Sequence, residues 1–268
     1  MKDVNLLISN GVNIEKSLEL FGDIETYNDT LYDFLKEVEG KLTKIKSYKE
    51  LADMANYAIL VHSLKSDAKY FGFEKLAELA YNHEMESKTN NMYYVTDHYD
   101  ELMKEANRIV ALVKQYMGIT TNSNTAPTSI RPLVIKDKTI LVVDDSNVVR
   151  NFVSKIFNQE YDVIIANDGK EALDIIQSNV DDKIVGMLLD LNMPNVDGFQ
   201  VLDYFKQANL FNRIPVAIIT GEGTQNNIQR AYQYPIVDML QKPFNEVNVK
   251  NIVNKLIMVH DMNIGNNH

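Results

Sequence analysis

Three aspartates in the C-terminal half of the sequence stand directly after runs of apolar residues. Asp144 and Asp145 follow the run Ile-Leu-Val-Val, and Asp190 follows Gly-Met-Leu-Leu. Thr220 and Lys242 stand at the ends of two later runs of the same kind. Carboxylates that converge in one place repel one another unless a cation lies among them. A hydroxyl and an ammonium group beside that cation are suited to contact the oxygens of a phosphoryl group.

Together these groups suit the transfer of phosphate onto a carboxylate. Hard oxygen ligands in a small polar cup favour Mg²⁺, which keeps several water molecules and recruits few carboxylates. In such a site one carboxylate is the nucleophile, and the cations neutralise the charge of the phosphoryl group. The sequence therefore predicts a magnesium-dependent phosphoryl site if the fold brings these residues together.

A second candidate for phosphoryl chemistry is His62, which lies in a helical pattern. At 100° per residue, Ala58, Lys65, Ser66 and Lys69 share its face, while the apolar stripe of the helix points elsewhere. We therefore expect an exposed imidazole among small residues, where another protein can dock. The two lysines would offset the charge of a phosphoryl group on the ring, and no carboxylate of the same face opposes it.

The other histidines lack such a setting. His83 stands beside Glu84 and Glu86, which is typical of a solvated, charged face. None of the histidines has the spacing of a metal site with a second histidine.

The elements that position the aspartates alternate between short β-branched runs and helical patterns. The expected strands are 139–143, 161–166, 184–189, 214–220 and 236–240, and the expected helices are 148–157, 170–177, 199–207, 225–232 and 247–258. This alternation predicts a doubly wound, five-stranded parallel sheet with helices on both faces. In the strand order 2-1-3-4-5 the first and third strands are neighbours, so the three aspartates converge beyond their C-terminal ends.

The N-terminal half has a different pattern, with apolar residues at intervals of three and four. This periodicity predicts a bundle of amphipathic helices over 1–118. Residues 119–136 are rich in Thr, Ser and Asn and contain two prolines, as is typical of a flexible linker. We expect the α/β domain over 137–260 and a tail over 261–268. A chain of 268 residues is long enough for these two domains.

The composition excludes several classes of protein. Without cysteine there are no disulfides, thiol nucleophiles or cysteine-bound metals, and a net charge of −10 argues against binding to nucleic acid or to an anionic membrane. The sequence has no apolar run long enough for a membrane span, no signal peptide and no phosphate-binding loop for ATP. We therefore expect a cytoplasmic protein that is not an ATP-dependent kinase.

Residues 138–256 resemble the response-regulator receiver domain, which has a flavodoxin-like fold. The match rests on Asp144-Asp145, Asp190, Met193-Pro194, Thr220 and Lys242-Pro243. The resemblance implies that Asp190 is the phosphoacceptor and that Thr220 and Lys242 bind the phosphoryl oxygens. The implied ligands of Mg²⁺ are Asp144, Asp145, Asp190 and the main-chain carbonyl of Asn192.

Two positions depart from the receiver pattern. Met239 stands where receivers usually carry Tyr or Phe, and Gly221 stands where Ala or Ser is usual. The change at Met239 affects the aromatic part of the family's switch rather than its phosphorylation chemistry. Asn192 and Glu222 lie two residues after Asp190 and Thr220, and their polarity favours rapid autodephosphorylation. Asn192 also argues against the aspartate-nucleophile phosphatases, which need a second aspartate at this position.

Residues 11–117 resemble the histidine-phosphotransfer (HPt) domain, a helical bundle. The resemblance rests on His62-Ser-Leu-Lys65-Ser66, followed by Gly72. It implies that His62 carries a phosphoryl group, supported by Lys65. Ser66 replaces the glycine of the family's pattern, and its small hydroxyl is able to bond phosphoryl oxygens.

The two resemblances predict a two-component phosphorelay protein that passes a phosphoryl group between His62, Asp190 and partner proteins. The expected partners are sensor histidine kinases, including hybrid kinases, and other receiver or HPt proteins. The alternative is a signalling adaptor, whose bundle only binds a partner under the control of receiver phosphorylation. The sequence leaves open the direction of transfer and the oligomeric state.

Overall fold

The computed structural model describes residues 2–119, 136–179, 183–221 and 225–265. The chain divides into two compact units, Met1–Val134 and Ile135–His268, which we describe separately. The boundary falls within the predicted linker, most of which lies outside the described residues, as does Glu222.

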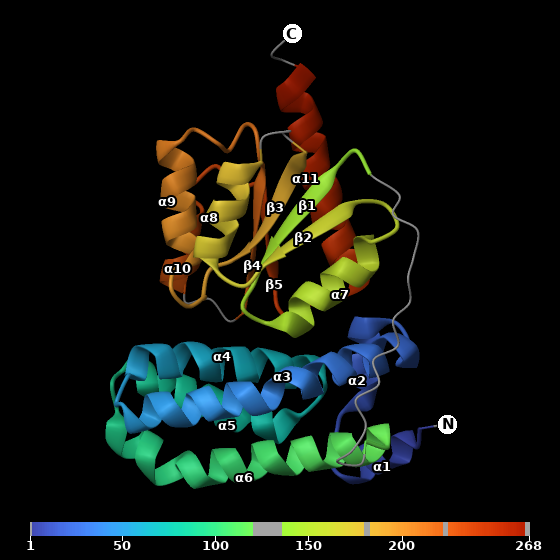
Figure 1. Cartoon of the computed structure of the whole chain (residues 1–268), viewed down its shortest axis with the longest axis vertical. Helices are drawn as coiled ribbons and strands as arrows, with labels where there is room; N and C mark the ends of the chain where they lie inside the picture. The colour runs from blue at the N-terminus through green and yellow to red at the C-terminus, as the bar shows by residue number, and fades with distance from the viewer. Residues whose placement is uncertain (1, 120–135, 180–182, 222–224, 266–268) are drawn as a thin grey trace. The chain divides into compact units, whose positions relative to one another are not determined.

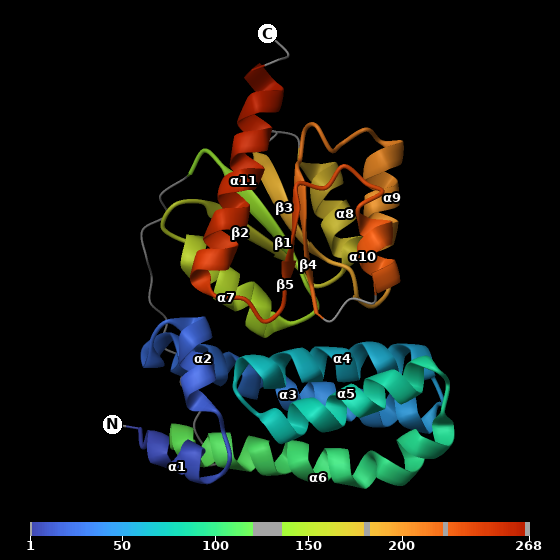
Figure 2. The same cartoon turned by 180° about the vertical axis from the view of Figure 1, so that it is seen from behind.

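The described part of the first unit is helical, as predicted. Its helices are α1 (Val4–Ser9), α2 (Ile14–Phe21), α3 (Ile24–Glu50), α4 (Met54–Tyr70), α5 (Glu74–Lys88) and α6 (Met92–Met117). The helices α3 to α6 form an elongated bundle (Figures 1 and 2). Each of α3, α4 and α6 begins after an Asp or Asn whose side chain accepts a hydrogen bond from a backbone N–H of the first turn.

The turn between α4 and α5 depends on Gly72. Its φ of +71° lies in the left-handed region, and its carbonyl accepts a hydrogen bond of 2.9 Å from the backbone N–H of Asn13. A Cβ atom at position 72 would lie 2.3 Å from the carbonyl oxygen of Asn13. Only glycine therefore allows the start of α2 to pack against this turn.

The second unit is a five-stranded parallel sheet in the predicted order β2-β1-β3-β4-β5. Its strands are β1 (Thr139–Val143), β2 (Asp162–Ala166), β3 (Ile184–Asp190), β4 (Val216–Thr220) and β5 (Asp238–Gln241). Its helices are α7 (Asn147–Phe157), α8 (Gly169–Ser178), α9 (Gly198–Gln207), α10 (Gln225–Ala231) and α11 (Glu246–Gly265). The helices α7 and α11 cover one face, and α8, α9 and α10 cover the other (Figure 1).

The centre of the sheet is fully buried. Every residue of β1, β3 and β4 is buried, because helices cover both faces of these strands. The edge strand β2 is more exposed. At the C-terminus the prediction is wrong in part, since α11 continues to Gly265 and includes the first five residues of the predicted tail. There Lys138 forms an ion pair of 2.8 Å with Asp261 and ties the helix to the start of the sheet.

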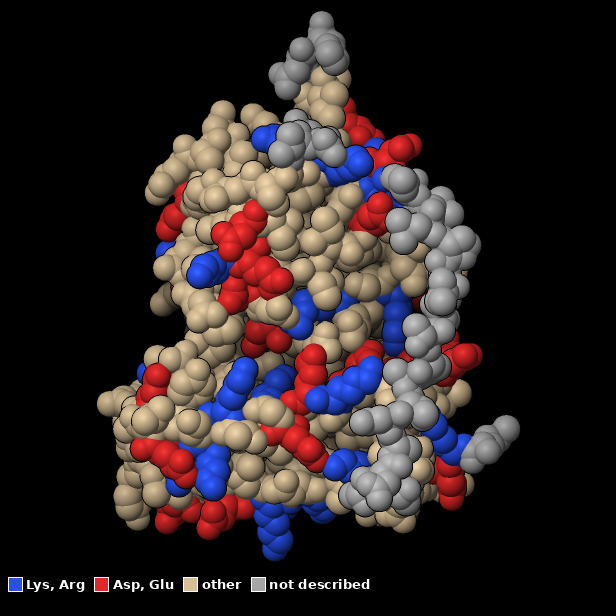
Figure 3. Space-filling view, viewed as in Figure 1, with Lys and Arg blue, Asp and Glu red and all other residues tan. Residues whose placement is uncertain are grey.

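Two general features bear on function. Acidic and basic side chains are intermixed over the face of each unit that Figure 3 shows. Among the described residues, no helix combines the length and the apolar character that a membrane span requires.

Candidate phosphoryl-transfer sites

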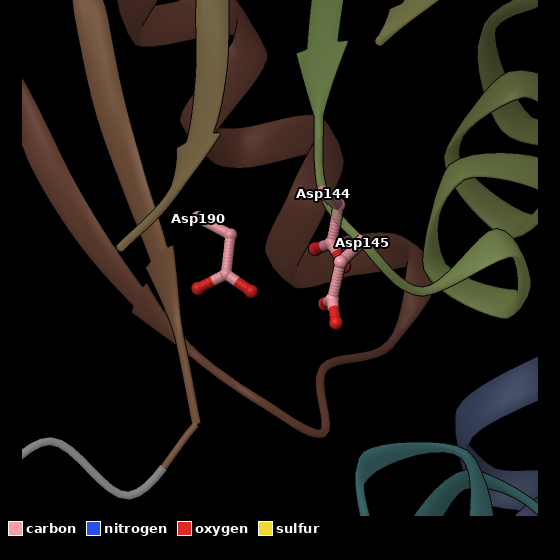
Figure 4. A group of neighbouring side chains, drawn as sticks. All are labelled: Asp144, Asp145 and Asp190. Atoms are coloured by element: carbon pink, nitrogen blue, oxygen red, sulfur yellow. The ribbon is translucent and has the colours of Figure 1, made fainter. Parts of the chain in front are cut away.

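The three aspartates meet at the C-terminal edge of the sheet, as predicted. Val143 lies opposite Leu189 in the parallel pair of β1 and β3, so the residues that follow them, Asp144 and Asp190, become neighbours. One carboxylate oxygen from each of Asp144, Asp145 and Asp190 lies within 4.8 Å of the others. Figure 4 shows the three side chains directed into the same space. Asp144 and Asp190 are completely buried, and Asp145 is half-buried.

Lys242 belongs to the same cluster. Its Nζ atom lies 2.6 Å from Oδ2 of Asp190 and 2.7 Å from Oδ2 of Asp144, and the side chain is buried. The backbone N–H of Lys242 donates to the carbonyl of Thr220, which holds the end of β5 against β4. Burial alone would lower the pKa of Lys242, but the attraction of Asp144 and Asp190 outweighs it and raises the pKa.

The buried carboxylates are electrostatically unfavourable without a further cation. Burial raises the pKa of Asp144 above its ordinary value; Lys242 opposes this shift, and the charges of Asp190 and Asp145 add to it. Carboxylate oxygens at this spacing are the donor set that Mg²⁺ prefers. The backbone N–H of Asn192 donates to Oδ1 of Asp190 over 3.2 Å, so the loop after β3 turns toward the cluster. The residues therefore fit a magnesium ion.

Thr220 provides a hydroxyl group beside the aspartates. It is the last residue of β4, and Ile219, just before it, pairs with Asp190 across the strands. Its Oγ1 atom is buried and has no hydrogen-bond partner among the residues that the structure describes. A buried hydroxyl without a partner is costly, and a phosphoryl oxygen bound at Asp190 would satisfy it.

Two residues that support this site were not singled out from the sequence. Gly198 begins α9, and a Cβ atom there would lie 2.3 Å from the main-chain oxygen of Asp190. The guanidinium of Arg150, on α7, donates a hydrogen bond to the main-chain carbonyl of Asp144. The glycine after Asp197 is a sequence signal for the tight turn. The contact of Arg150 has no signal in the local sequence pattern.

Met239 occupies the predicted place on β5. Its side chain is partly buried and packs against the apolar core between the sheet and the helices α8 to α10. The residue thus has a structural role in the described core, and the consequence of the missing aromatic ring for the switch stays a prediction.

In the first unit, the environment of His62 differs from the prediction. The residue is only 2% exposed, and its Nδ1 atom lies 2.7 Å from Oε1 of Glu84. The predicted exposure of the imidazole is therefore wrong, and a carboxylate from outside α4, which the prediction did not consider, lies beside the ring. The reason is that α5 packs along α4 and brings Glu84 to His62, whereas the prediction considered the face of α4 alone.

The hydrogen bond with Glu84 determines which nitrogen of His62 carries the hydrogen. A carboxylate only accepts hydrogen bonds, so Nδ1 of His62 carries the hydrogen and Nε2 of the neutral ring has a free lone pair. The Nε2 atom is buried and has no hydrogen-bond partner in the described parts of the chain. Burial alone would raise the pKa of Glu84, but the hydrogen bond from His62 and the charge and hydrogen bond of Lys65 hold that pKa well below its ordinary value.

Lys65 and Ser66 are also buried rather than exposed. The ammonium of Lys65 lies 2.7 Å from Oε2 of Glu84 and 5.5 Å from the centre of the Tyr81 ring. Lys88 contacts the same carboxylate at 2.5 Å. Lys65 therefore offsets the charge of Glu84 and does not lie on an open face, and its support of a phosphoryl group stays a prediction.

His83 is the other correction in this unit. It is completely buried instead of solvated. The hydroxyl of Tyr57 donates to its Nδ1 atom over 2.8 Å, and its Nε2 atom donates to the carbonyl of His98 over 3.3 Å. Burial lowers the pKa of His83.

The comparisons with known proteins concern the second unit. The family model for the response regulator receiver domain matches residues 140–254. The chain is 30% identical over 120 residues to the two-component response regulator ORR3 of Oryza sativa subsp. indica, covering 44% of this chain and 90% of that protein. It is 31% identical over 107 residues to the chemotaxis protein CheY1 of Helicobacter pylori (strain J99), covering 39% of this chain and 85% of that protein.

A further relative is the two-component response regulator ARR6 of Arabidopsis thaliana, with 28% identity over 132 residues, 46% of this chain and 71% of that protein. Receiver domains in general interact with histidine kinases and phosphotransfer proteins, and they work in two-component signalling. The matched residues contain the acidic cluster, Thr220 and Lys242. With its five-stranded parallel sheet and this residue set, the chain belongs to the response regulator receiver family.

Proposed function

We propose that the protein is a phosphorelay component that carries phosphoryl groups on two residues, Asp190 of the receiver and His62 of the HPt-like bundle. One observation carries the second half of this proposal. The hydrogen bond to Glu84 leaves the lone pair of His62 Nε2 free, and this atom has no hydrogen-bond partner among the described residues. A nitrogen held in this way is suited to attack phosphorus.

At the receiver, a carboxylate oxygen of Asp190 attacks the phosphorus of a donor. A P–O bond to Asp190 forms as the bond to the leaving group of the donor breaks. Bound Mg²⁺ would supply charge neutralisation for the phosphoryl oxygens, with Asp144, Asp145, Asp190 and the Asn192 carbonyl as its ligands. Lys242 adds a positive charge beside Asp190, and Thr220 donates its hydroxyl hydrogen to a phosphoryl oxygen.

At the bundle, the lone pair of His62 Nε2 attacks the phosphoryl group of a partner's phosphoaspartate. The P–O bond to that aspartate breaks and the carboxylate leaves, while the hydrogen on Nδ1 of His62 stays in place. The ring therefore gains positive charge, which the Glu84 carboxylate at 2.7 Å stabilises. The reverse reaction returns the phosphoryl group to a receiver.

The proposed partners are sensor histidine kinases, simple or hybrid, and other receiver or HPt proteins. Hydrolysis of the phosphoaspartate at Asp190 would reset the receiver, aided by the polar residues Asn192 and Glu222. We propose a cytoplasmic protein without ATP-dependent kinase activity of its own.

The alternative function is an adaptor, in which phosphorylation of Asp190 controls binding by the bundle and His62 never carries phosphate. The two functions are separated by incubation with a purified sensor kinase, a phosphorelay partner and radiolabelled ATP. Phosphohistidine is labile in acid and phosphoaspartate is labile in base, so the two labels are distinguished by treatment of the products.

The wild type is expected to acquire both labels. His62→Gln should lose only the acid-labile label and Asp190→Asn only the base-labile label. His98→Gln serves as a matched control, since this histidine lies on α6 and its ring stacks on Tyr94. A wild type that never acquires acid-labile phosphate would contradict the phosphorelay and support the adaptor.

A further inference from the structure

Ser66 is the second buried polar group without a partner on α4. Its side chain is 6% exposed, and its Oγ atom has no hydrogen-bond partner among the described residues. Serine hydroxyls inside helices usually bond the carbonyl four residues earlier or point into solvent. The Ser66 hydroxyl does neither, so its burial is unfavourable until something binds to it.

The position of Ser66 relates it to His62. The two residues are four apart, so their side chains lie one turn from each other on the same face of α4. The Cα–Cβ bond of a helical residue tilts toward the N-terminus of the helix, which directs Ser66 back toward the turn of His62. The two atoms of this face that have no hydrogen-bond partner among the described residues, His62 Nε2 and Ser66 Oγ, thus belong to side chains one turn apart.

Several polar groups near His62 are already bonded to other residues, whereas the hydroxyl of Ser66, which has no partner among the described residues, is free to donate a hydrogen bond. The carboxylate of Glu84 already binds Nδ1 of His62 and the ammonium groups of Lys65 and Lys88. Lys65 is therefore held at the Glu84 side of the histidine. Ser63, on the same helix, accepts a hydrogen bond of 2.8 Å from Lys41, so its hydroxyl is also occupied.

We propose that Ser66 is a phosphoryl-binding residue, whose hydroxyl donates a hydrogen bond to an oxygen of the phosphoryl group on His62 Nε2. This inference rests on the proposed function of His62 as a phosphoacceptor. The bond forms only in the phosphorylated state. It therefore shifts the phosphotransfer equilibrium toward His62 and slows the loss of phosphate from it.

The test measures the equilibrium constant for phosphoryl transfer between a phosphorylated receiver partner and His62. The full chain carries Asp190→Asn in every sample, so that its own receiver takes no phosphate. Ser66→Ala is expected to lower the equilibrium constant about tenfold, the size of one hydrogen bond to a charged group. The half-life of the isolated phosphohistidine should shorten as well. Ser63→Ala is the matched control and should leave both quantities within twofold of the parent protein.

A second pair of variants distinguishes the effect of the hydroxyl on phosphotransfer from the effect of the side chain's shape. Ser66→Thr keeps the hydroxyl, and Ser66→Val has nearly the same volume without it. Helix content and unfolding of both variants are compared by circular dichroism. The threonine variant is expected to transfer phosphate to His62 with a clearly larger equilibrium constant than the valine variant.

Equal equilibrium constants for the Ser66→Ala variant and its parent, or for the Thr and Val variants, would overturn the role of Ser66. Such a result would leave the proposed function intact, because His62 would still be phosphorylated. Failure of the proposed function is recognised separately, since the parent protein itself would then acquire no phosphohistidine.

Discussion

At the scale of single residues, both candidate sites depend on carboxylates that are buried beside cations. Asp144 and Asp190 share Lys242, and Glu84 is shared by His62, Lys65 and Lys88 (the last on the exposed side). A buried ion pair contributes little net stability, but removal of one partner leaves an unpaired charge. In both sites the arrangement fixes the orientation of the proposed nucleophile, Asp190 in one and His62 in the other.

The first prediction concerns Glu84. Glu84→Gln keeps the shape of the side chain but removes the charge that stabilises the positive imidazole ring during transfer. We expect phosphotransfer to His62 to slow by about 10- to 100-fold, by analogy with metal-binding histidines that lose the carboxylate orienting their ring. Glu78→Gln, an exposed position on the same helix, is the control. Transfer at the wild-type rate in a folded Glu84→Gln protein would show that His62 does not need this carboxylate.

The second prediction concerns the metal at Asp190. Without a cation, the three carboxylates repel an incoming phosphate. We expect acetyl phosphate to label the protein only when Mg²⁺ is added, and chelation of the metal ion should abolish labelling. Asp190→Asn should remove the label, whereas Asp174→Asn, at an exposed position on α8, should keep it. Base-labile phosphate on the Asp190→Asn variant would place the nucleophile elsewhere.

At the scale of elements, the sequence predicts a residue's environment where this depends on the pattern of one element or on the order of the strands. The alternation of apolar runs predicts each strand of the sheet within about two residues, because covered parallel strands are continuously apolar. The convergence of Asp144, Asp145 and Asp190 follows from strand order. The burial of His62 could not be predicted in this way, since it depends on Glu84, 22 residues later on a neighbouring helix. The same limit explains the wrong prediction for His83.

The third prediction concerns the turn between α4 and α5. Gly72→Ala places a methyl group against the Asn13 carbonyl in a backbone conformation that alanine disfavours. We expect the unfolding free energy of the first unit to fall by about 2–4 kcal/mol. Gly40→Ala is the opposite case, because this glycine lies inside α3 with open space around its Cα. It should raise the unfolding free energy by roughly 0.5–1 kcal/mol. Denaturant titration followed by circular dichroism measures both changes, and equal effects of the two substitutions would contradict the role of Gly72.

At the scale of the whole molecule, the chain combines two compact units with different kinds of core. The receiver buries its acidic cluster at the edge of a sheet, and the first unit buries two histidines among helices. Because the units differ in their buried ionisable groups, their stabilities should respond differently to pH. In the described part of the first unit, burial lowers the pKa of His83, which lies outside both proposed phosphoryl sites.

The fourth prediction is a loss of stability of the first unit in mild acid. The folded state lowers the pKa of His83 below the ordinary value of 6.5, so the unfolded chain binds a proton more readily. The unfolding free energy is therefore unaffected by this group above about pH 6.5. It falls as the pH drops below that value, by at most about 1.4 kcal/mol for each pH unit. The loss ends once the folded state is protonated as well.

The measurement is amide hydrogen exchange in α4 and α5 at pH 7.5 and pH 5.5, corrected for the intrinsic dependence of exchange on pH. Protection should decrease at the lower pH in the wild type. His83→Gln is expected to be less stable at pH 7.5, because it breaks the hydrogen bond from Tyr57, but to lose little further protection in acid. His260→Gln changes a buried histidine of the receiver and should keep the acid response of α4 and α5. An acid response that persists in full in His83→Gln would assign it to another group.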